Sequence, residues 1–391
     1  MPAPSEFKNK DFKLTTFNRI EEEIRLRSDD PDSIIPLHIG DTHVDLPEEL
    51  NRPLMFEPWN DRLSRYGNTQ GEMELRKRLA EKIKSKNRIP VAGAEEIQIT
   101  YGASGALFVA MRRLFNPSDE ILTLAPYWTI LRVVASSAGA TLVEVPFFDR
   151  IDRLHSQDDL QELLLPYLSE KTAGIYYNNP NNPSGVMMKK AHIEQIARFA
   201  QEKDLWVLSD EAYEDFVWSN EPYLSIGSLP GMYERTVSIF TMAKSYAASG
   251  LRMGCLAAPK GVVATVNPTV VGTGYEPNRS AQVQWIRGLE RFDDILPRLK
   301  SAYRRCLAAA KENLQVPYIE PEGSFYLFLD LRDKWKGRSD SEKLESMLNA
   351  GVAMSPGEAF GAEYDGWARF CFIAEPPDRI AEAARRVNLI K

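Results

Sequence analysis

A lysine in the second half of the chain occupies a place where a reactive amine can lie. Lys244 follows the apolar run 237–242 and precedes a stretch of small residues that contains Arg252. A lysine that is desolvated and flanked by another cation has a lowered pKa, and its neutral amine can attack an aldehyde. Arg252 could supply that cation and could also bind a phosphate. Taken alone, a single lysine is more often a solvated surface charge.

An aspartate and a tyrosine follow another apolar run in the same way. Asp210 ends the run 205–210, and Tyr213 follows it by one helical turn. An aspartate here can keep a pyridine nitrogen protonated, which makes the ring an electron sink, and Tyr213 could donate a hydrogen bond to an oxygen on that ring. The ordinary interpretations are a helix N-cap for the aspartate and packing against a sheet for the tyrosine.

Two loops offer further polar groups. The segment YGASGAL places residues 102–105 at the start of a predicted helix, where free backbone N–H groups form an anion site. It lacks the Gly-Lys-Ser/Thr ending of a P-loop, so simple helix capping explains it equally well. Asn182 lies in NNPNNPSG, a turn-rich loop after a predicted strand.

Alternating strands and helices must position these residues. Apolar strands that alternate with amphipathic helices favour a mostly parallel sheet covered on both faces. In such sheets ligands bind beyond the carboxyl ends of the strands, where Lys244 and Asp210 lie. The predicted strands are 97–100, 120–126, 141–147, 174–179, 205–210, 237–242 and 253–259.

The chain is predicted to form two domains of α/β class. A large three-layer αβα domain with a mostly parallel sheet is expected over residues 51–285. A smaller α+β domain is expected from 1–50 together with 286–391. The second part contains a long helix at 296–314, strands at 325–331 and 368–374, and a final helix at 378–390.

The bulk composition excludes several classes of function. The 391 residues carry a formal net charge of −7, which does not attract nucleic acid or anionic lipid. There is no apolar signal segment and no apolar stretch long enough to span a membrane, so a cytoplasmic protein is expected. Three scattered cysteines suit a reducing compartment, and the four histidines have no metal-ligand spacing, so no metal site is predicted.

Seven segments, in order along nearly the whole chain, resemble motifs of the fold-type I pyridoxal phosphate (PLP) enzymes, and within them the class I/II aminotransferases. The resemblance implies the PLP-transferase fold, PLP as cofactor, and transfer of an α-amino group from an amino acid to a keto acid. The segments are RYGNTQGEMELRKRLAEK, YGASGAL, APYW, NNPNNPSG, SDEAYED, TMAKSYAASGLRMG and ARFCFIA.

The same resemblance implies a role for each matching residue. Lys244 would form the aldimine with the cofactor and shuttle protons, Asp210 would pair with the ring nitrogen, and Tyr213 and Asn182 would hold the ring oxygen. Arg369 would bind the substrate α-carboxylate, with Gly40 beside it. Trp128 would stack on the ring; Ala103, Ser104, Thr241 and Arg252 would bind the phosphate; and Tyr66 would reach the phosphate of the other subunit of a homodimer.

One segment departs from the family pattern. Many of these enzymes carry Glu-Pro-Asp or Asp-Pro-Asp after the glycine near the substrate, whereas this chain has Thr42 and His43. PLP-dependent arginine oxidases and guanidino-amino-acid cyclases resemble aminotransferases and carry a histidine in a similar stretch. His43 is therefore either a structural histidine or a substrate-binding one, and an oxidase or cyclase is the alternative function. A non-catalytic protein with a retained fold is a third interpretation, although no DNA-binding extension is visible.

A second departure concerns the substrate. Members specific for dicarboxylates place a second arginine in the segment VVGTGYEPNRSAQ, where this chain has Gly272 or a neighbour, with Glu276 close by. This disfavours aspartate or glutamate and leaves aromatic, neutral and cationic amino acids open.

Overall fold

The predicted strands assemble into one seven-stranded sheet. The computed structural model describes residues 15–27, 33–51 and 63–391. The strand order is β2-β8-β7-β6-β5-β3-β4, and only β8 runs antiparallel to its neighbours. The prediction of a mostly parallel sheet is therefore confirmed. The strands are β2 (Ile97–Tyr101), β3 (Glu120–Ala125), β4 (Thr141–Pro146), β5 (Thr172–Asn178), β6 (Trp206–Asp210), β7 (Thr236–Thr241) and β8 (Met253–Ala257).

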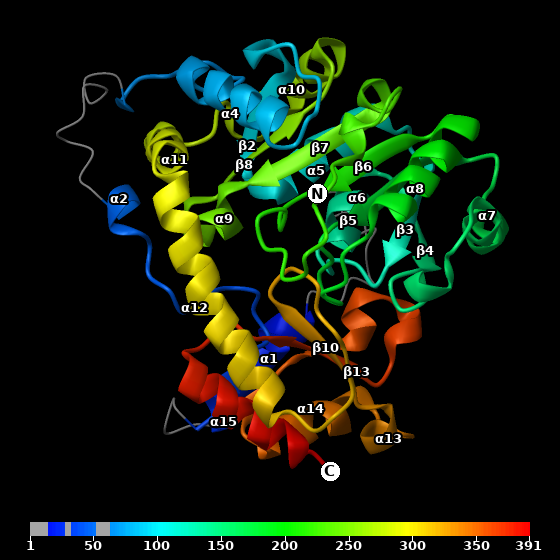
Figure 1. Ribbon diagram of the computed structural model, residues 1–391, viewed down its shortest axis with the longest axis vertical. Coiled ribbons are helices and arrows are strands. Elements are labelled where there is room, and N and C mark those ends of the chain that lie inside the picture. The colour runs from blue at the N-terminus through cyan, green and yellow to red at the C-terminus, as the bar shows by residue number, and fades with distance from the viewer. Residues whose placement is uncertain (1–14, 28–32, 52–62) are drawn as a thin grey trace, which may run out of the picture.

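Helices cover both faces of this sheet, as the continuous apolar strands require. Successive residues of a strand point to opposite faces, and here they enter different cores. Ile121 and Leu208 pack in one core, while their neighbours Leu122 and Val207 pack in the other. The first core is closed by α5 (Gly102–Leu114), α6 (Leu131–Ala138) and α10 (Lys260–Gly274), and the second by α7 (Gln157–Leu164) and α8 (Lys190–Glu202) (Figure 1).

A third core joins the β2–β8 end of the sheet to the rest of the chain. It contains residues of α4 (Met73–Ser85) and α11 (Arg279–Glu290), and it continues along α12 (Phe292–Asn313) to α15 (Pro377–Asn388). Figure 1 shows α12 running from the level of the large sheet down to α15. The long helix and the final helix that the sequence predicts are both present.

The C-terminal part forms an α+β unit around a small antiparallel sheet of order β12-β13-β10-β9. β1 of the N-terminal segment pairs in parallel with β11, which ties that segment to this unit. Domain boundaries at residues 51 and 285 remain a prediction, and part of 1–50 lies outside the described residues. The elements are β1 (Ile35–Pro36), β9 (Tyr318–Ile319), β10 (Tyr326–Asp330), α13 (Arg332–Trp335), α14 (Asp340–Asn349), β11 (Val352–Ala353), β12 (Ser355–Pro356) and β13 (Trp367–Cys371).

Several elements differ from the sequence pattern. The run WTILRVVASSAG (residues 128–139) predicts a helix, but α6 begins only at Leu131, so Trp128 lies between β3 and α6. The helix α10 lies where the pattern predicts no element, because its residues are apolar without a clear period and include Pro268. The other elements are α1 (Thr15–Arg27), which contains the segment IEEEIRLR whose pattern predicts a short surface helix, the short α2 (Glu48–Asn51) and α9 (Met242–Ser245). Among the described helices, none is both long and apolar enough to cross a membrane.

Candidate active site

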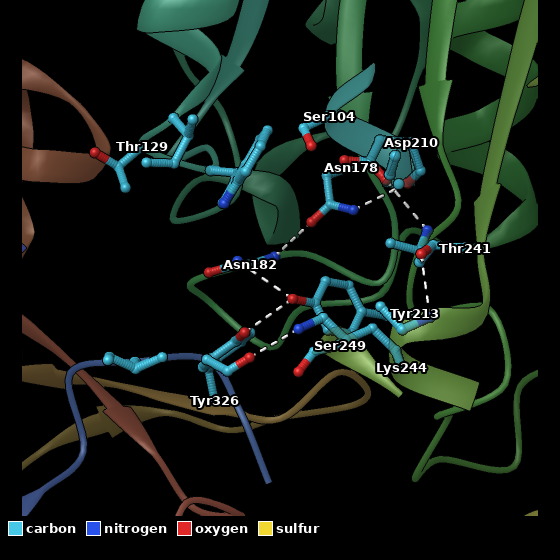
Figure 2. A pocket seen from close by; sticks show the side chains of 18 of the residues that line it. Ser104, Thr129, Asn178, Asn182, Asp210, Tyr213, Thr241, Lys244, Ser249 and Tyr326 are labelled. Atoms are coloured by element: carbon cyan, nitrogen blue, oxygen red, sulfur yellow. Dashed lines mark hydrogen bonds between the residues drawn. The ribbon is translucent and has the colours of Figure 1, made fainter. Parts of the chain in front are cut away.

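A cavity of about 380 Å³ lies at the carboxyl ends of β5, β6 and β7, facing β10 and β13 of the smaller unit. Its size suits a cofactor with a small substrate. The lining includes eleven residues of the predicted site: Gly40, Ala103, Ser104, Trp128, Asn182, Asp210, Tyr213, Thr241, Lys244, Arg252 and Arg369. Figure 2 shows side chains from separate loops converging on this space.

Lys244 projects from the single-turn helix α9, which follows β7. Its Nζ donates a hydrogen bond of 2.7 Å to the carbonyl of Gly40. Burial lowers the pKa of Lys244, and the positive charges of Arg369 and Arg252 act in the same direction. A lysine with a lowered pKa holds more of the neutral, nucleophilic amine near pH 7. The position therefore suits covalent chemistry with a carbonyl compound.

Asp210 is a buried carboxylate at the end of β6. It accepts hydrogen bonds from the backbone N–H of Ala212 at 3.2 Å and from the Tyr176 hydroxyl at 3.1 Å. Burial raises its pKa to about 6. No ion pair to Asp210 is found among the residues that the structure describes. A carboxylate buried in this way is complementary to a cationic group placed in the cavity.

The phenol of Tyr213 lies at the centre of a short hydrogen-bonded chain (Figure 2). Its hydroxyl is 2.8 Å from the hydroxyl of Tyr326 and accepts a 3.4 Å hydrogen bond from Asn182 Nδ2. Burial, reinforced by Tyr326, raises the pKa of Tyr213, so this phenol stays protonated. Tyr213 can therefore donate to an oxygen held in the cavity.

The opposite end of the cavity forms an anion cradle. The helix α5 begins at Gly102, so its first backbone N–H groups have no partner within the helix. Arg252 Nη1 donates to the carbonyl of Ser249 at 2.8 Å, and Nη2 donates to Ser104 Oγ at 3.4 Å. Arg252 adopts the left-handed conformation with φ of 54°, which costs on the order of 1–2 kcal/mol for a residue with a side chain. Such strain is typical of functional positions.

Arg369 projects from β13 and is only 3% exposed. Its Nη2 donates to the carbonyl of His38 at 2.6 Å, and its Nη1 donates to Asn182 Oδ1 at 3.1 Å. Its buried Nε has no hydrogen-bond partner in the described part of the chain. The guanidinium also lies 4.6 Å from the ring centre of Tyr326. A fixed, incompletely satisfied guanidinium at the cavity wall can bind a carboxylate.

Two predicted site residues lie outside this cavity. Tyr66 is 83% exposed, and its ring centre lies 4.8 Å from that of Tyr275. The chain does not bring Tyr66 to its own cavity. The Nδ1 of His43 lies 2.9 Å from the carbonyl of Ile373, and His43 is not among the lining residues. The structural interpretation of His43 is therefore favoured over the substrate-binding one.

The segment VVGTGYEPNRSAQ, where dicarboxylate-specific members carry a second arginine, also lies away from the cavity. Glu276 Oε1 accepts a hydrogen bond from the backbone N–H of Gly67, and the Glu276 carbonyl accepts one from the Tyr101 hydroxyl. Glu276 thus anchors the loop around Tyr66. Gly272 is exposed, and a side chain there would meet open space.

Several lining residues are not identified from the sequence. Tyr326 is the most informative, because its polar hydroxyl in the apolar run FYLFLDL is the one signal that separates it from an ordinary core residue. A side chain on Gly40 would collide with that hydroxyl, which explains the glycine. The other unanticipated lining residues are Ile39, Thr129, Ile130, Asn178, Ala212, Ala243 and Ser249, while Gly102 belongs to the anion site expected at residues 102–105. Within the described ranges no three or more His, Cys, Asp and Glu side chains gather as a metal site.

Comparisons with known proteins agree with this geometry. The model of the family described as aminotransferase class I and II matches residues 35–387. An aspartate aminotransferase from Pyrococcus abyssi is 32% identical over 91% of this chain and 91% of its own length. An aromatic-amino-acid aminotransferase from Thermococcus litoralis is 32% identical over 92% of each chain.

The solved structures agree as well. A Thermus thermophilus aspartate aminotransferase mutant superposes with a TM-score of 0.89 at 25% identity, covering 100% of both chains. The fold, the predicted transferase activity and the relatives all agree, and the family match spans most of the sequence. The chain therefore belongs to the aminotransferase class I and II family, whose members transfer amino groups and generally depend on PLP.

Proposed function

We propose that this protein binds PLP in the cavity described above, with Lys244 as the point of covalent attachment, and transfers the amino group of an α-amino acid with an apolar or aromatic side chain. The observation that carries the proposal is the placement of Lys244, Asp210 and the anion cradle around one cavity. Burial lowers the pKa of Lys244 and raises the pKa of Asp210, and both shifts support a site that forms a covalent bond at the amine and pairs the carboxylate with a bound cation.

The residues present fit each part of the cofactor. The cradle of Ala103, Ser104, Thr241 and Arg252 would hold the phosphate, since it combines a helix N-terminus with a guanidinium. The unpaired carboxylate of Asp210 would face the ring nitrogen. Tyr213 and Asn182 would hold the ring oxygen, and Trp128 would cover the ring. When bound, PLP supplies an electron sink that stabilises negative charge at the substrate Cα.

The side chains of the protein perform the remaining tasks. Arg369 binds the substrate α-carboxylate through its guanidinium and so fixes the orientation of Cα. Lys244 Nζ, once free, accepts the Cα proton as a general base, and its lowered pKa suits that task near neutral pH. Asp210 stays ionised when a cation faces it, and Tyr213 keeps its proton for hydrogen bonding.

The wall near Arg369 supports the proposed substrate class. Lys244, Arg252 and Arg369 are the only cations among the described lining residues. Each is already assigned, to the covalent bond, the phosphate and the α-carboxylate respectively. Ile39 and Ile130 line the cavity beside Trp128 and Tyr326, which favours an apolar or aromatic side chain over a second carboxylate. His43 is not among the residues that line the cavity, which supports amino-group transfer over the oxidase or cyclase alternative.

We also propose a homodimer with shared active sites, in which Tyr66 reaches the phosphate of the partner. The support is the exposure of Tyr66, at 83%, and the tilted contact of its ring with the ring of Tyr275. An exposed pair of aromatic side chains supports an interface at this position. A cytoplasmic location remains a prediction from the sequence.

Reductive trapping tests the attachment site. The protein is reconstituted with PLP, reduced with borohydride, digested and analysed by mass spectrometry. We expect the added mass on the peptide that contains Lys244 and its loss in Lys244→Ala, while the exposed Lys84→Ala control behaves as wild type. A parallel assay compares phenylalanine, leucine, aspartate and arginine as donors to a keto acid. Added mass elsewhere would refute the site, and a preference for aspartate or arginine would refute the substrate class.

A further inference from the structure

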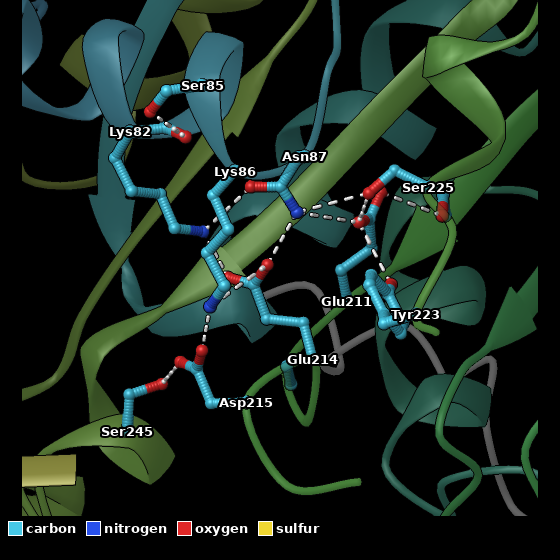
Figure 3. Close-up of polar contacts among 12 residues, drawn as sticks. Lys82, Ser85, Lys86, Asn87, Glu211, Glu214, Asp215, Tyr223, Ser225 and Ser245 are labelled. Atoms are coloured by element: carbon cyan, nitrogen blue, oxygen red, sulfur yellow. Dashed lines mark hydrogen bonds and ion pairs between the residues drawn. The ribbon is translucent and has the colours of Figure 1, made fainter. Parts of the chain in front are cut away.

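The residues that follow the site residues in sequence point away from the cavity, into a second polar cluster. Glu211 follows Asp210, Glu214 follows Tyr213, and Ser245 follows Lys244. We define the rear cluster as Lys82, Lys86, Asn87, Glu211, Glu214, Asp215 and Ser245. Figure 3 shows the two lysines and Asn87 reaching from the end of α4 toward the three carboxylates.

Two ion pairs hold the middle of the rear cluster. Lys82 Nζ is hydrogen-bonded to Glu214 Oε1, and Lys86 Nζ to Asp215 Oδ1. The side chains of Glu214 and Asp215 are only 6% and 2% exposed. Because removing either cation would leave an uncompensated buried charge, these pairs fix the loop after β6 against α4. That loop carries Tyr213.

Hydrogen bonds extend the rear cluster to both sides. Asn87 Nδ2 donates to Glu214 Oε2 at 2.5 Å and to Glu211 Oε2 at 3.5 Å. Glu211 also accepts a 2.9 Å bond from the Tyr223 hydroxyl. On the other side, Ser245 Oγ donates to Asp215 Oδ2 at 2.5 Å. Lys86 Nζ also lies 3.9 Å from Glu214 Oε2, so one continuous network joins the residues next to Asp210, Tyr213 and Lys244.

The electrostatics agree with a tightly held network. Burial acts to raise the pKa of Glu214, but Lys82 and Lys86 outweigh it and hold the pKa below its ordinary value. Burial and the charge of Glu214 raise the pKa of Glu211 to about 7. Lys82 Nζ also lies 4.4 Å from the ring centre of Phe240 in β7, so the cation contacts the strand that leads to Lys244.

From these contacts we infer that the rear cluster positions Lys244 and Tyr213 for the reaction, with Ser245 as the residue that links Lys244 to the ion pairs. α9 is a single turn, so it has few internal hydrogen bonds with which to fix the direction of Lys244. The bond from Ser245 to Asp215 supplies an anchor one residue away. The inference rests on the proposed function for its kinetic consequence, but the placement of the amine is testable without the cofactor.

Ser245→Ala is the cleanest test because it breaks the link without changing any charge. We expect kcat to fall by roughly tenfold, as for a slightly misplaced reacting group, with KM for the amino donor within about twofold. The midpoint of the pH titration of the bound-cofactor absorbance should shift, and Ser245→Thr should restore both values. The double variant K82M/E214Q, which removes both members of one ion pair, should show the same kinetic pattern. Lys84→Met, on the exposed face of α4, should match wild type.

A cofactor-free measurement separates this inference from the proposed function. Trace labelling with acetic anhydride reports the reactivity of the Lys244 amine relative to Lys84 as the pH is raised. We expect Ser245→Ala to change the labelling of Lys244 and not of Lys84. If labelling, kcat and the titration midpoint all equal those of wild type, the positioning role is refuted. If wild type fails to bind PLP while labelling still changes, the proposed function fails and the positioning role stands.

Discussion

Replacing Asp210 by asparagine should stabilise the cofactor-free protein while damaging the loaded enzyme. Burial raises the pKa of Asp210 to about 6, against about 3.9 for an exposed aspartate, and each pKa unit corresponds to about 1.4 kcal/mol. Between about pH 4 and pH 6 the native state therefore binds more protons here than the unfolded state, so stability falls as the pH rises. Above this window the ionised, buried carboxylate costs about 3 kcal/mol of unfolding free energy.

Asparagine keeps the shape of this position and removes its charge. Its Oδ1 can accept from the Ala212 N–H, and its Nδ2 can donate to the Tyr176 hydroxyl in place of the present bond. The variant therefore removes the cost of the charge, but the buried Tyr176 O–H proton loses its present acceptor. We expect Asp210→Asn to raise the unfolding free energy of the cofactor-free protein by about 1–2 kcal/mol at pH 8, because the lost Tyr176 bond offsets part of the gain, and to be less stabilising at pH 4.

Urea denaturation of the stripped protein at pH 4, 5, 6, 7 and 8 measures this difference. Asp333→Asn is the matched control, because Asp333 is exposed and its replacement should change stability little at any pH. In the loaded enzyme the same Asp210→Asn change should lower kcat/KM by about 10²-fold. The reason is that the variant loses the charge interaction between Asp210 and the cofactor, which we take to be about 3 kcal/mol. An unchanged or lowered stability at pH 8 would show that Asp210 is already compensated in the cofactor-free protein, and the reasoning would fail.

Three further substitutions test other contacts of the site. Arg369→Lys should raise KM for the amino donor by about 10- to 100-fold, because a lysine cannot form the two-pronged bond to a carboxylate; steady-state kinetics with an unchanged KM would contradict this. Trp128→Ala should weaken PLP binding by about tenfold through lost stacking, as measured by absorbance titration of the stripped protein. Tyr66→Phe should weaken PLP binding by a few-fold through one lost hydrogen bond; sedimentation velocity should show a two-chain particle for wild type and variant, and a single-chain particle would refute the shared site.

The sequence by itself determines the large sheet and the residues at its carboxyl edge. All seven strands follow from apolar runs that alternate with helices, because a strand buried on both faces leaves a continuous apolar signature. Lys244 and Asp210 could be identified for the same reason, since each directly follows such a strand. The chemical roles predicted for Lys244 and Asp210 follow from their residue types and from the order of the motifs along the chain.

The tertiary structure decides which distant residues meet. Tyr326 lies far from Tyr213 in the sequence, yet their hydroxyls are 2.8 Å apart, and the apolar strand around Tyr326 gives little sign of this. Arg369 donates to the carbonyl of His38, which lies near the other end of the chain. His43 contacts the carbonyl of Ile373 and does not line the cavity. A local pattern records burial and periodicity, whereas such contacts depend on how β1, β10 and β13 pack against the large sheet. The rear cluster behind Lys244 is decided in the same way, because its ion pairs join α4 to a loop more than a hundred residues later.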